Sequence, residues 1–208
     1  MLFRSGSEEG KKVDFDIQRV VLRKSKVYYR DVAAGNDLAV AISYVTLKGK
    51  ISGAVVEAGL SGNLAAERLL IGPDDYSLKE SINLHADVIL DQDAGTINIT
   101  RAGLRAGDED FSVSGLLSYG KRVNATDLLI SVEQADIEKL FILIPERFTS
   151  SLKDYRPGGR LTAELRVKGN YGGKQSPLVT AGFSVKKGSL AHLQHKTRLS
   201  GIMASGSY

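Results

Sequence analysis

The fold is decided by residues 135–168, ADIEKLFILIPERFTSSLKDYRPGGRLTAELRVK, because the hydrophobic period changes from helical to extended within this one stretch. Four apolar residues recur at i, i+3, i+4 and i+7, the spacing of one helical face. They are Ile137, Leu140, Phe141 and Ile144. Asp136 can cap this helix, and Pro145 interrupts it because proline has no backbone N–H. We therefore expect a short helical insertion near residues 136–155, whose four apolar residues cap the neighbouring strands.

The second half of the stretch predicts a turn and then a strand. Residues 156–159, RPGG, are typical of a turn that ends the insertion. After them, Leu161, Ala163, Leu165 and Val167 alternate with polar and charged residues. A period of two places the apolar residues on one side, so this strand should have one face in water.

The same alternation of apolar and polar residues recurs in the sequence before residue 135 and after residue 168. It predicts about ten strands, including residues 38–50, 82–90, 96–101, 111–117, 123–132, 179–185 and a strand-like tail over 197–208. The parity of the apolar residues changes near Thr126 and Asp127, which predicts a bulge there. Residues 51–73 are interrupted by glycines and predict only short strands. Half-polar strands joined by short turns favour an antiparallel meander over a parallel α/β sheet.

The continuous apolar face leaves two architectures open. It could fill the interior of a β-sandwich, which would act as a structural or interaction module. It could instead line an elongated curled sheet, a β-groove whose face holds acyl chains. The residues that we expect to line such a groove are Ile82, Leu84, Val88, Phe111, Val113, Leu161, Leu165, Val167, Val179, Phe183 and Val185.

Composition limits the class of protein. The chain has 208 residues, of which 42% are hydrophobic and 25% charged, as in ordinary globular proteins. We expect residues 1–12 to be disordered and residues 13–208 to form a single β-rich section of a longer protein. The net charge of +4 is scattered rather than clustered, so we expect no nucleic-acid binding. The absence of cysteine excludes disulfides and thiolate chemistry, and no apolar run is long enough for a spanning helix.

The polar residues do not converge on a recognisable active site. His192 and His195 have a metal-like spacing only on a helix and lack a nearby third ligand. The Asp91 and Asp93 pair lacks the further ligands of a calcium loop, and a hairpin turn explains it. Residues 169–174, GNYGGK, lack the spacing of a phosphate-binding loop. We expect no catalytic residues, no metal, no cofactor and no enzymatic activity.

Several segments resemble the C-terminal β-rich region of AsmA-like proteins of the bacterial envelope. The segments are DLLISVEQADIEKLFILIP (127–145), the YRPGG motif (155–159), LTAELRVKG (161–169) and AGFSVKKGSL (181–190). Strands with similar texture occur over residues 20–29 and 111–115, so the resemblance covers most of residues 13–208.

The resemblance implies an elongated, groove-forming β-sheet related to bridge-like lipid transfer proteins. It also implies a periplasmic location, attachment to the inner membrane through an N-terminal helix that this sequence does not contain, and contact with envelope proteins. The implied role is binding and transfer of phospholipid acyl chains in support of outer-membrane biogenesis.

Overall fold

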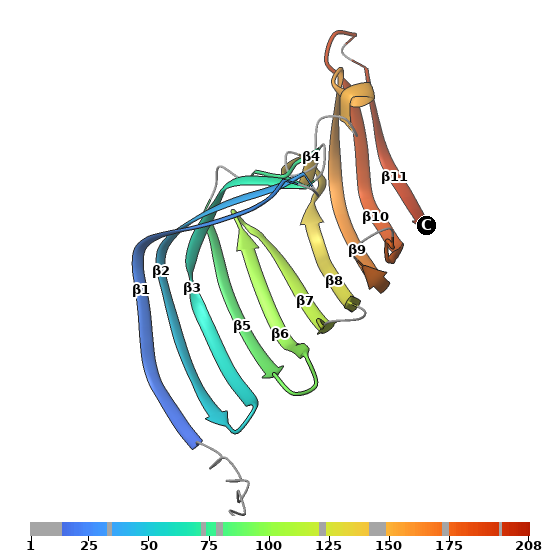
Figure 1. Ribbon diagram of the computed structural model, residues 1–208. Coiled ribbons are helices and arrows are strands. Elements are labelled where there is room, and N and C mark those ends of the chain that lie inside the picture. Colours follow the sequence, from blue (N-terminus) through green and yellow to red (C-terminus); the bar gives the residue numbers. More distant parts are fainter. Residues whose placement is uncertain are drawn as a thin grey trace, which may run out of the picture.

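The computed structural model of the protein describes residues 14–32, 35–71, 74–77, 81–120, 124–141, 149–171, 175–195 and 197–208. Its strands form one antiparallel sheet in the order β1-β2-β3-β5-β6-β7-β8-β9-β10-β11, and the short strand β4 pairs with β3 beside this path (Figure 1). Strands that follow one another in the sequence are therefore neighbours in space. This confirms the prediction of a mainly β, antiparallel meander, but the sheet is not strongly curled as the expected β-groove would be.

The sheet is built from long strands, which are β1 (Asp14–Asp31), β2 (Asn36–Ser52), β3 (Val55–Ile71), β5 (Ser81–Asp91), β6 (Thr96–Ala106), β7 (Glu109–Ser118), β8 (Asn124–Asp136), β9 (Tyr155–Tyr171), β10 (Leu178–His192) and β11 (Arg198–Ser207). Strand β4 spans Asp74–Asp75. Between β8 and β9 lie the α-helix α1 (Ile137–Phe141) and the 3-10 helix η1 (Ser150–Leu152).

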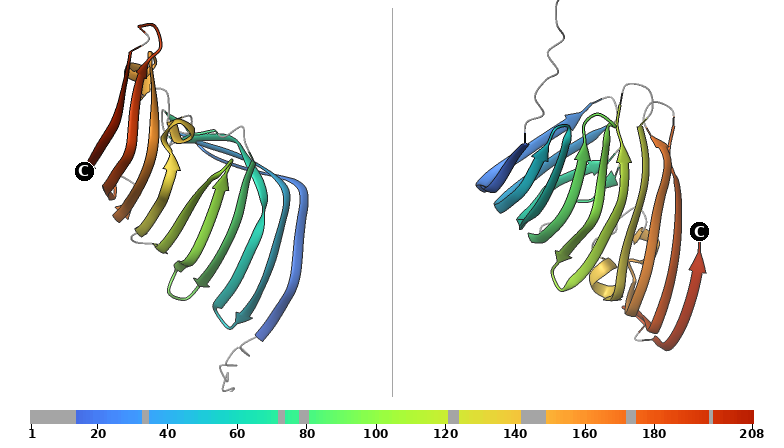
Figure 2. Two further views of the ribbon diagram at one scale, coloured as in Figure 1. Left: turned by 180° about the vertical axis from the view of Figure 1, so that it is seen from behind. Right: turned by 90° about the horizontal axis from the view of Figure 1, so that it is seen from below.

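The sheet is open, with β1 at one edge and β11 at the other. Seen from behind and from below, the strands lie in a single layer (Figure 2). The two-sheet sandwich that the sequence pattern left open is therefore not the arrangement of these strands. Strands β1 to β3 bend near their middle (Figure 1), where Lys24 of β1 has a φ of 48° and the register of β2 on β3 shifts between Ile42 and Tyr44. Such bulges bend a strand and increase its twist.

The structure corrects the predicted limits of the helical insertion. The α-helix ends at Phe141, residues 142–148 lie outside the described part of the chain, and the next helical turn is only Ser150–Leu152. Tyr155 already belongs to β9, and residues 156–159 continue that strand opposite β10 instead of forming a turn. Gly159 has a φ of 123°, which glycine can adopt. It lies opposite the register shift of β10 between Lys186 and Ser189.

Two further predictions were wrong. Residues 55–71 form one long strand rather than short pieces. Its Gly62 is required there, because a Cβ would lie 2.7 Å from the Cα of Val45 on β2.

The register of β7 on β8 is unbroken past Thr126 and Asp127, and the bulge of β8 lies instead between Val132 and Ala135 on its β9 side. The expected disordered segment, residues 1–12, lies outside the described residues.

The sheet has only a thin core. Five of the eight buried hydrophobic residues are alanines, and no large side chain in the described part of the chain is less than 2% exposed. The total accessible surface is 15128 Å², whereas a compact protein of 22.4 kDa would expose about 9,400 Å². Most of the apolar surface of the sheet is therefore packed only against its neighbours within the layer.

Candidate functional site

The strand register gathers apolar side chains on one face. Directly opposite residues in an antiparallel pair point to the same side of a sheet. One such row crosses all ten long strands and consists of Leu22, Val45, Gly62, Leu84, Leu104, Phe111, Val132, Ala163, Phe183 and Gly206. The next row consists of Val20, Leu47, Leu60, Ala86, Ala102, Val113, Ile130, Leu165 and Ala181. Neither row contains a charged residue, and we call the side that they define the apolar face.

All eleven residues expected to line a groove lie on this apolar face. Ile82, Leu84 and Val88 lie on β5, and Phe111 and Val113 lie on β7. The other six are in register with them through β8, and they are Leu161, Leu165 and Val167 on β9 and Val179, Phe183 and Val185 on β10. Sequence reasoning missed the contributions of β2, β3 and β6, such as Val45, Leu60 and Leu104, because register shifts in β2 and β6 and glycines in β3 break the period-two alternation.

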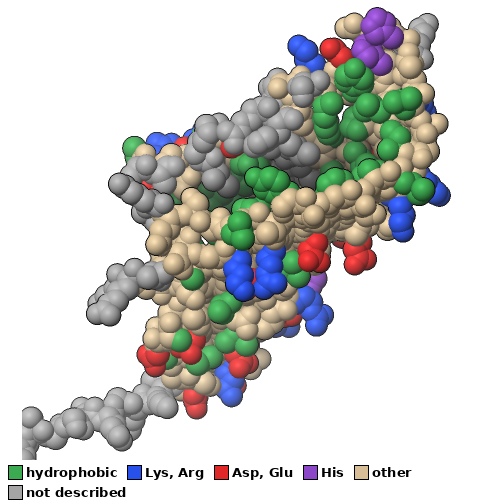
Figure 3. All heavy atoms as spheres, turned by 90° about the vertical axis from the view of Figure 1, so that its right-hand side faces the viewer, with side chains coloured by type: hydrophobic (Ala, Val, Ile, Leu, Met, Phe, Trp, Pro, Cys, Tyr) green, Lys and Arg blue, Asp and Glu red, His purple; other side chains and the backbone are tan. Residues whose placement is uncertain are grey.

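The apolar face keeps large side chains in contact with solvent. Phe183 is 44% exposed and Leu22 is 46% exposed, although both belong to the row that crosses the sheet. On the side seen in Figure 3, hydrophobic side chains gather on a hollowed surface near the histidines, and charged side chains lie along the outer margin. Burying a fully exposed side chain of this size contributes about 1.5–3 kcal/mol, so covering the exposed part of either residue would stabilise a complex by roughly half of that. The face therefore favours a partner that is itself apolar.

The opposite side, which we call the polar face, carries residues such as Thr46, Ser61, His85, Ser112, Ser131 and Glu164, which form one row in register. Several of its charges are paired across strands. Arg105 donates to Asp110 at 2.6 and 2.7 Å, and Arg166 donates to Asp127 at 2.9 Å through both Nε and Nη2. These hydrogen bonds lower the pKa of the Asp110 and Asp127 carboxyls below their ordinary value. These ion pairs lie on a solvated surface, since the side chains of Arg105, Asp110 and Arg166 are all more than half exposed.

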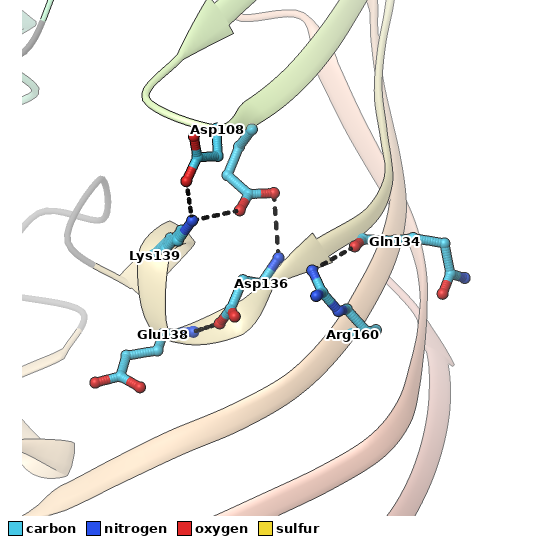
Figure 4. Close-up of polar contacts among 7 residues, drawn as sticks. Asp108, Gln134, Asp136, Glu138, Lys139 and Arg160 are labelled. Atoms are coloured by element: carbon cyan, nitrogen blue, oxygen red, sulfur yellow. Dashed lines mark hydrogen bonds and ion pairs between the residues drawn. The ribbon is translucent and has the colours of Figure 1, made fainter.

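Helix α1 is fixed at one end of β8 by polar contacts (Figure 4). Asp136 caps it as predicted, since its carboxylate accepts the N–H of Glu138 at 2.9 Å. The buried carboxylate of Glu109, on β7, accepts the N–H of Asp136 at 3.1 Å, and Lys139 pairs with Asp108 in the β6–β7 turn. Nothing in the sequence pattern had marked Glu109, because an acidic residue beside a turn normally faces water.

The structure describes three of the four apolar residues that we expected to form a cap. The helix contacts β8 and β9. Ile137, Leu140 and Phe141 are half-buried, and Ile144 lies outside the described residues. Ala135, which precedes the helix on β8, is 1% exposed. The helix therefore packs beside β9 and the end of β8, and its action as a cap over the wider apolar face remains a hypothesis.

The candidate polar sites are local structure. Asp91 accepts the N–H of Ala94 at 2.9 Å, which stabilises the β5–β6 hairpin turn as expected. The rings of His192 and His195 have centroids 4.4 Å apart and planes tilted by 48°, and Nδ1 of His192 accepts backbone N–H groups of the turn. In the described parts of the chain no three metal-ligating side chains are grouped closely enough to hold an ion. The described residues also contain no helix long and apolar enough to cross a membrane.

Comparison of this chain with protein-family models, with curated proteins and with solved structures finds no match. The site must therefore be interpreted from its own geometry.

Proposed function

We propose that this chain is a periplasmic, lipid-binding section of an AsmA-like envelope protein, in which the apolar face acts as a groove for phospholipid acyl chains. In this proposal the section supports lipid transfer and outer-membrane biogenesis, and the parent protein is held at the inner membrane by a helix outside this chain. The observation that carries the proposal is the uncharged row running from Leu22 on β1 to Phe183 on β10.

The dimensions of the face suit acyl chains. Nine intervals between ten strands span about 43 Å at a strand spacing of about 4.8 Å. A bilayer core of about 30 Å contains two acyl chains end to end, so one chain needs about 15 Å. Each CH₂ group that leaves water for an apolar surface contributes about 0.8 kcal/mol. Several methylene groups on this face would therefore hold a lipid, while its headgroup stays in water.

The resemblance to AsmA-like proteins supports the same function independently of the face. Three of its segments fall in β8 with α1, in β9 and in β10, and all three strands contribute to the apolar face.

A pair of adjacent residues provides the test. Val179 lies on the apolar face opposite Val167, and Leu178 lies on the polar face opposite Lys168. Both are exposed hydrophobic residues near the beginning of β10. We expect Val179→Asp to reduce phospholipid recovered with the purified protein and uptake of a fluorescent phospholipid, whereas Leu178→Asp leaves both close to the wild-type level. Lipid is identified by native mass spectrometry.

Two results would contradict the proposal. One is a wild-type protein that carries no phospholipid and takes up none from vesicles. The other is an equal loss of binding in the two variants, because binding would then not depend on the apolar face.

A further inference from the structure

Strand β1 is an edge strand with an unusual amount of exposed apolar surface. Six of its large hydrophobic residues are 46–69% exposed, and they are Phe15, Val20, Leu22, Val27, Tyr28 and Tyr29. Many natural edge strands are very short, which limits their pairing with another chain. With 18 residues, β1 is instead the longest strand of the sheet. The opposite edge strand, β11, has 10 residues, and its Gly201 has a φ of 72°.

We propose that β1 pairs antiparallel with β1 of a second copy of this chain, with Leu22 facing Leu22 at the twofold axis. Pairing of the same strand from two copies gives a closed dimer, whereas pairing of β1 with β11 would propagate without closure. The proposal does not depend on lipid binding.

The pattern of β1 is complementary to itself in this register. On the apolar face, Phe15 lies opposite Tyr29 of the second copy, and Ile17 lies opposite Val27. These four residues and Leu22 all point to the apolar side, because their partners on β2 are Ile51, Leu38, Gly49, Val40 and Val45. Pairs of aromatic and β-branched residues across strands stabilise a sheet. The apolar face therefore continues from one copy into the other.

Charges on the polar face also match. Asp14 lies opposite Arg30 of the second copy, and Asp16 lies between Arg30 and Lys26 as diagonal neighbours. The beginning of β1 is acidic and its second half is basic, so an antiparallel pair brings opposite charges together twice. Arg30 also donates to Asp37 at 2.8 Å, which holds its guanidinium near the strand.

The irregularities of β1 fit the same register. The pairing of β1 with β2 shifts between Ile17 and Val20, and Lys24 has a φ of 48°. With Leu22 opposite Leu22, residues 18–20 of one copy face residues 24–26 of the other. The irregularity at residues 18–19 of one copy thus lies opposite the irregularity at Lys24 of the other. The regular segments before and after them keep their apolar residues on the same side of the sheet.

The chain has no cysteine, so a disulfide formed by a single introduced cysteine shows that this position contacts the same position of a second copy. Opposite Cα atoms in an antiparallel pair lie about 4.5–5.5 Å apart, within the range that a disulfide spans. We expect Leu22→Cys to form an intermolecular disulfide under mild oxidation. Met203→Cys, on the opposite edge strand and 83% exposed, should form one only at the rate of random collision.

Association is measured by light scattering and sedimentation. We expect the wild-type chain to dimerise with increasing concentration, and Leu22→Lys to weaken the dimer about tenfold or more because two ammonium groups then meet at the axis. Met203→Lys is the matched control and should dimerise normally. Asp14→Arg and Arg30→Asp should each weaken the dimer, and the double variant should regain affinity.

A monomer at every accessible concentration would overturn the proposal. So would a dimer that forms equally well with Leu22→Lys, or equal oxidation of the Leu22→Cys and Met203→Cys variants, since either result would place contact elsewhere.

Discussion

Thr126 places a polar atom where the apolar face offers it no partner. Its side chain is 8% exposed, and Oγ1 has no hydrogen-bond partner in the part of the chain that the structure describes. A buried unsatisfied hydroxyl costs about 1–3 kcal/mol. We expect Thr126→Val, which keeps the shape and the β propensity, to raise the free energy of unfolding by about 1 kcal/mol in urea denaturation. A lower stability of this variant would show that the hydroxyl is hydrogen-bonded in solution.

Asp127 makes the stability of the folded sheet depend on pH. The hydrogen bonds from Arg166 lower the pKa of its carboxyl below the ordinary value of 3.8, so this carboxylate stabilises the folded state above pH 3.8. The contribution is lost as the pH falls through the lower, folded-state pKa. We expect Asp127→Asn to be less stable than wild type at neutral pH, with a difference that shrinks in acid. A urea-midpoint difference that persists or grows below pH 3.8 would contradict this assignment.

At the scale of residues, the sequence predicted the apolar face well. The alternation in β5, β7, β9 and β10 sets the side on which each residue lies, and pairing in register carries that side across the sheet. The position of the bulge was wrong because bulges depend on the opposing strand. In β8 the bulge includes Gln134, with a φ of 52°, where the strand leaves for α1.

Helix α1 is too short to be stable alone, since isolated helices need about 12–15 residues. Its stability must come from its surroundings, which are the packing on β8 and β9 and the polar contacts of Asp136, Glu109 and Lys139. We expect Glu109→Ala to leave the N–H of Asp136 without an acceptor, and to lower the free energy of unfolding by about 1–3 kcal/mol. Hydrogen exchange over residues 136–141 should rise in parallel.

Glu109→Gln is the matched control, because the amide oxygen can still accept that hydrogen bond. A Glu109→Ala variant with wild-type exchange and stability would mean that packing on β8 and β9 alone fixes the helix.

The elements that sequence reasoning missed have local signals that oppose their final structure. Gly59 and Gly62 interrupt the period of β3, yet a Cβ on Gly59 would contact Asp87 of β5 and one on Gly62 would collide with β2. Residues 156–159 contain the two residue types most typical of turns, but pairing with β10 holds them extended. Long-range pairing therefore overrides local propensity at both places.

At the scale of the molecule, a single open layer should differ from a compact domain in solution. A compact chain of 208 residues would have a radius of gyration of about 17 Å. We expect small-angle scattering of the monomeric Leu22→Lys variant to give a clearly larger radius and an elongated distance distribution. A radius at the compact value would mean that the sheet closes on itself or is covered in solution.

The position of a bound acyl chain can be measured by fluorescence quenching. A single cysteine at 179 or at 178 places a fluorescent label on the apolar or on the polar face, in a chain that has no other cysteine. We expect phospholipid with a nitroxide in the middle of its acyl chain to quench the label on Val179→Cys strongly and the label on Leu178→Cys weakly. Equal quenching at the two positions, or quenching at neither, would contradict the assignment of the apolar face as the lipid-binding surface.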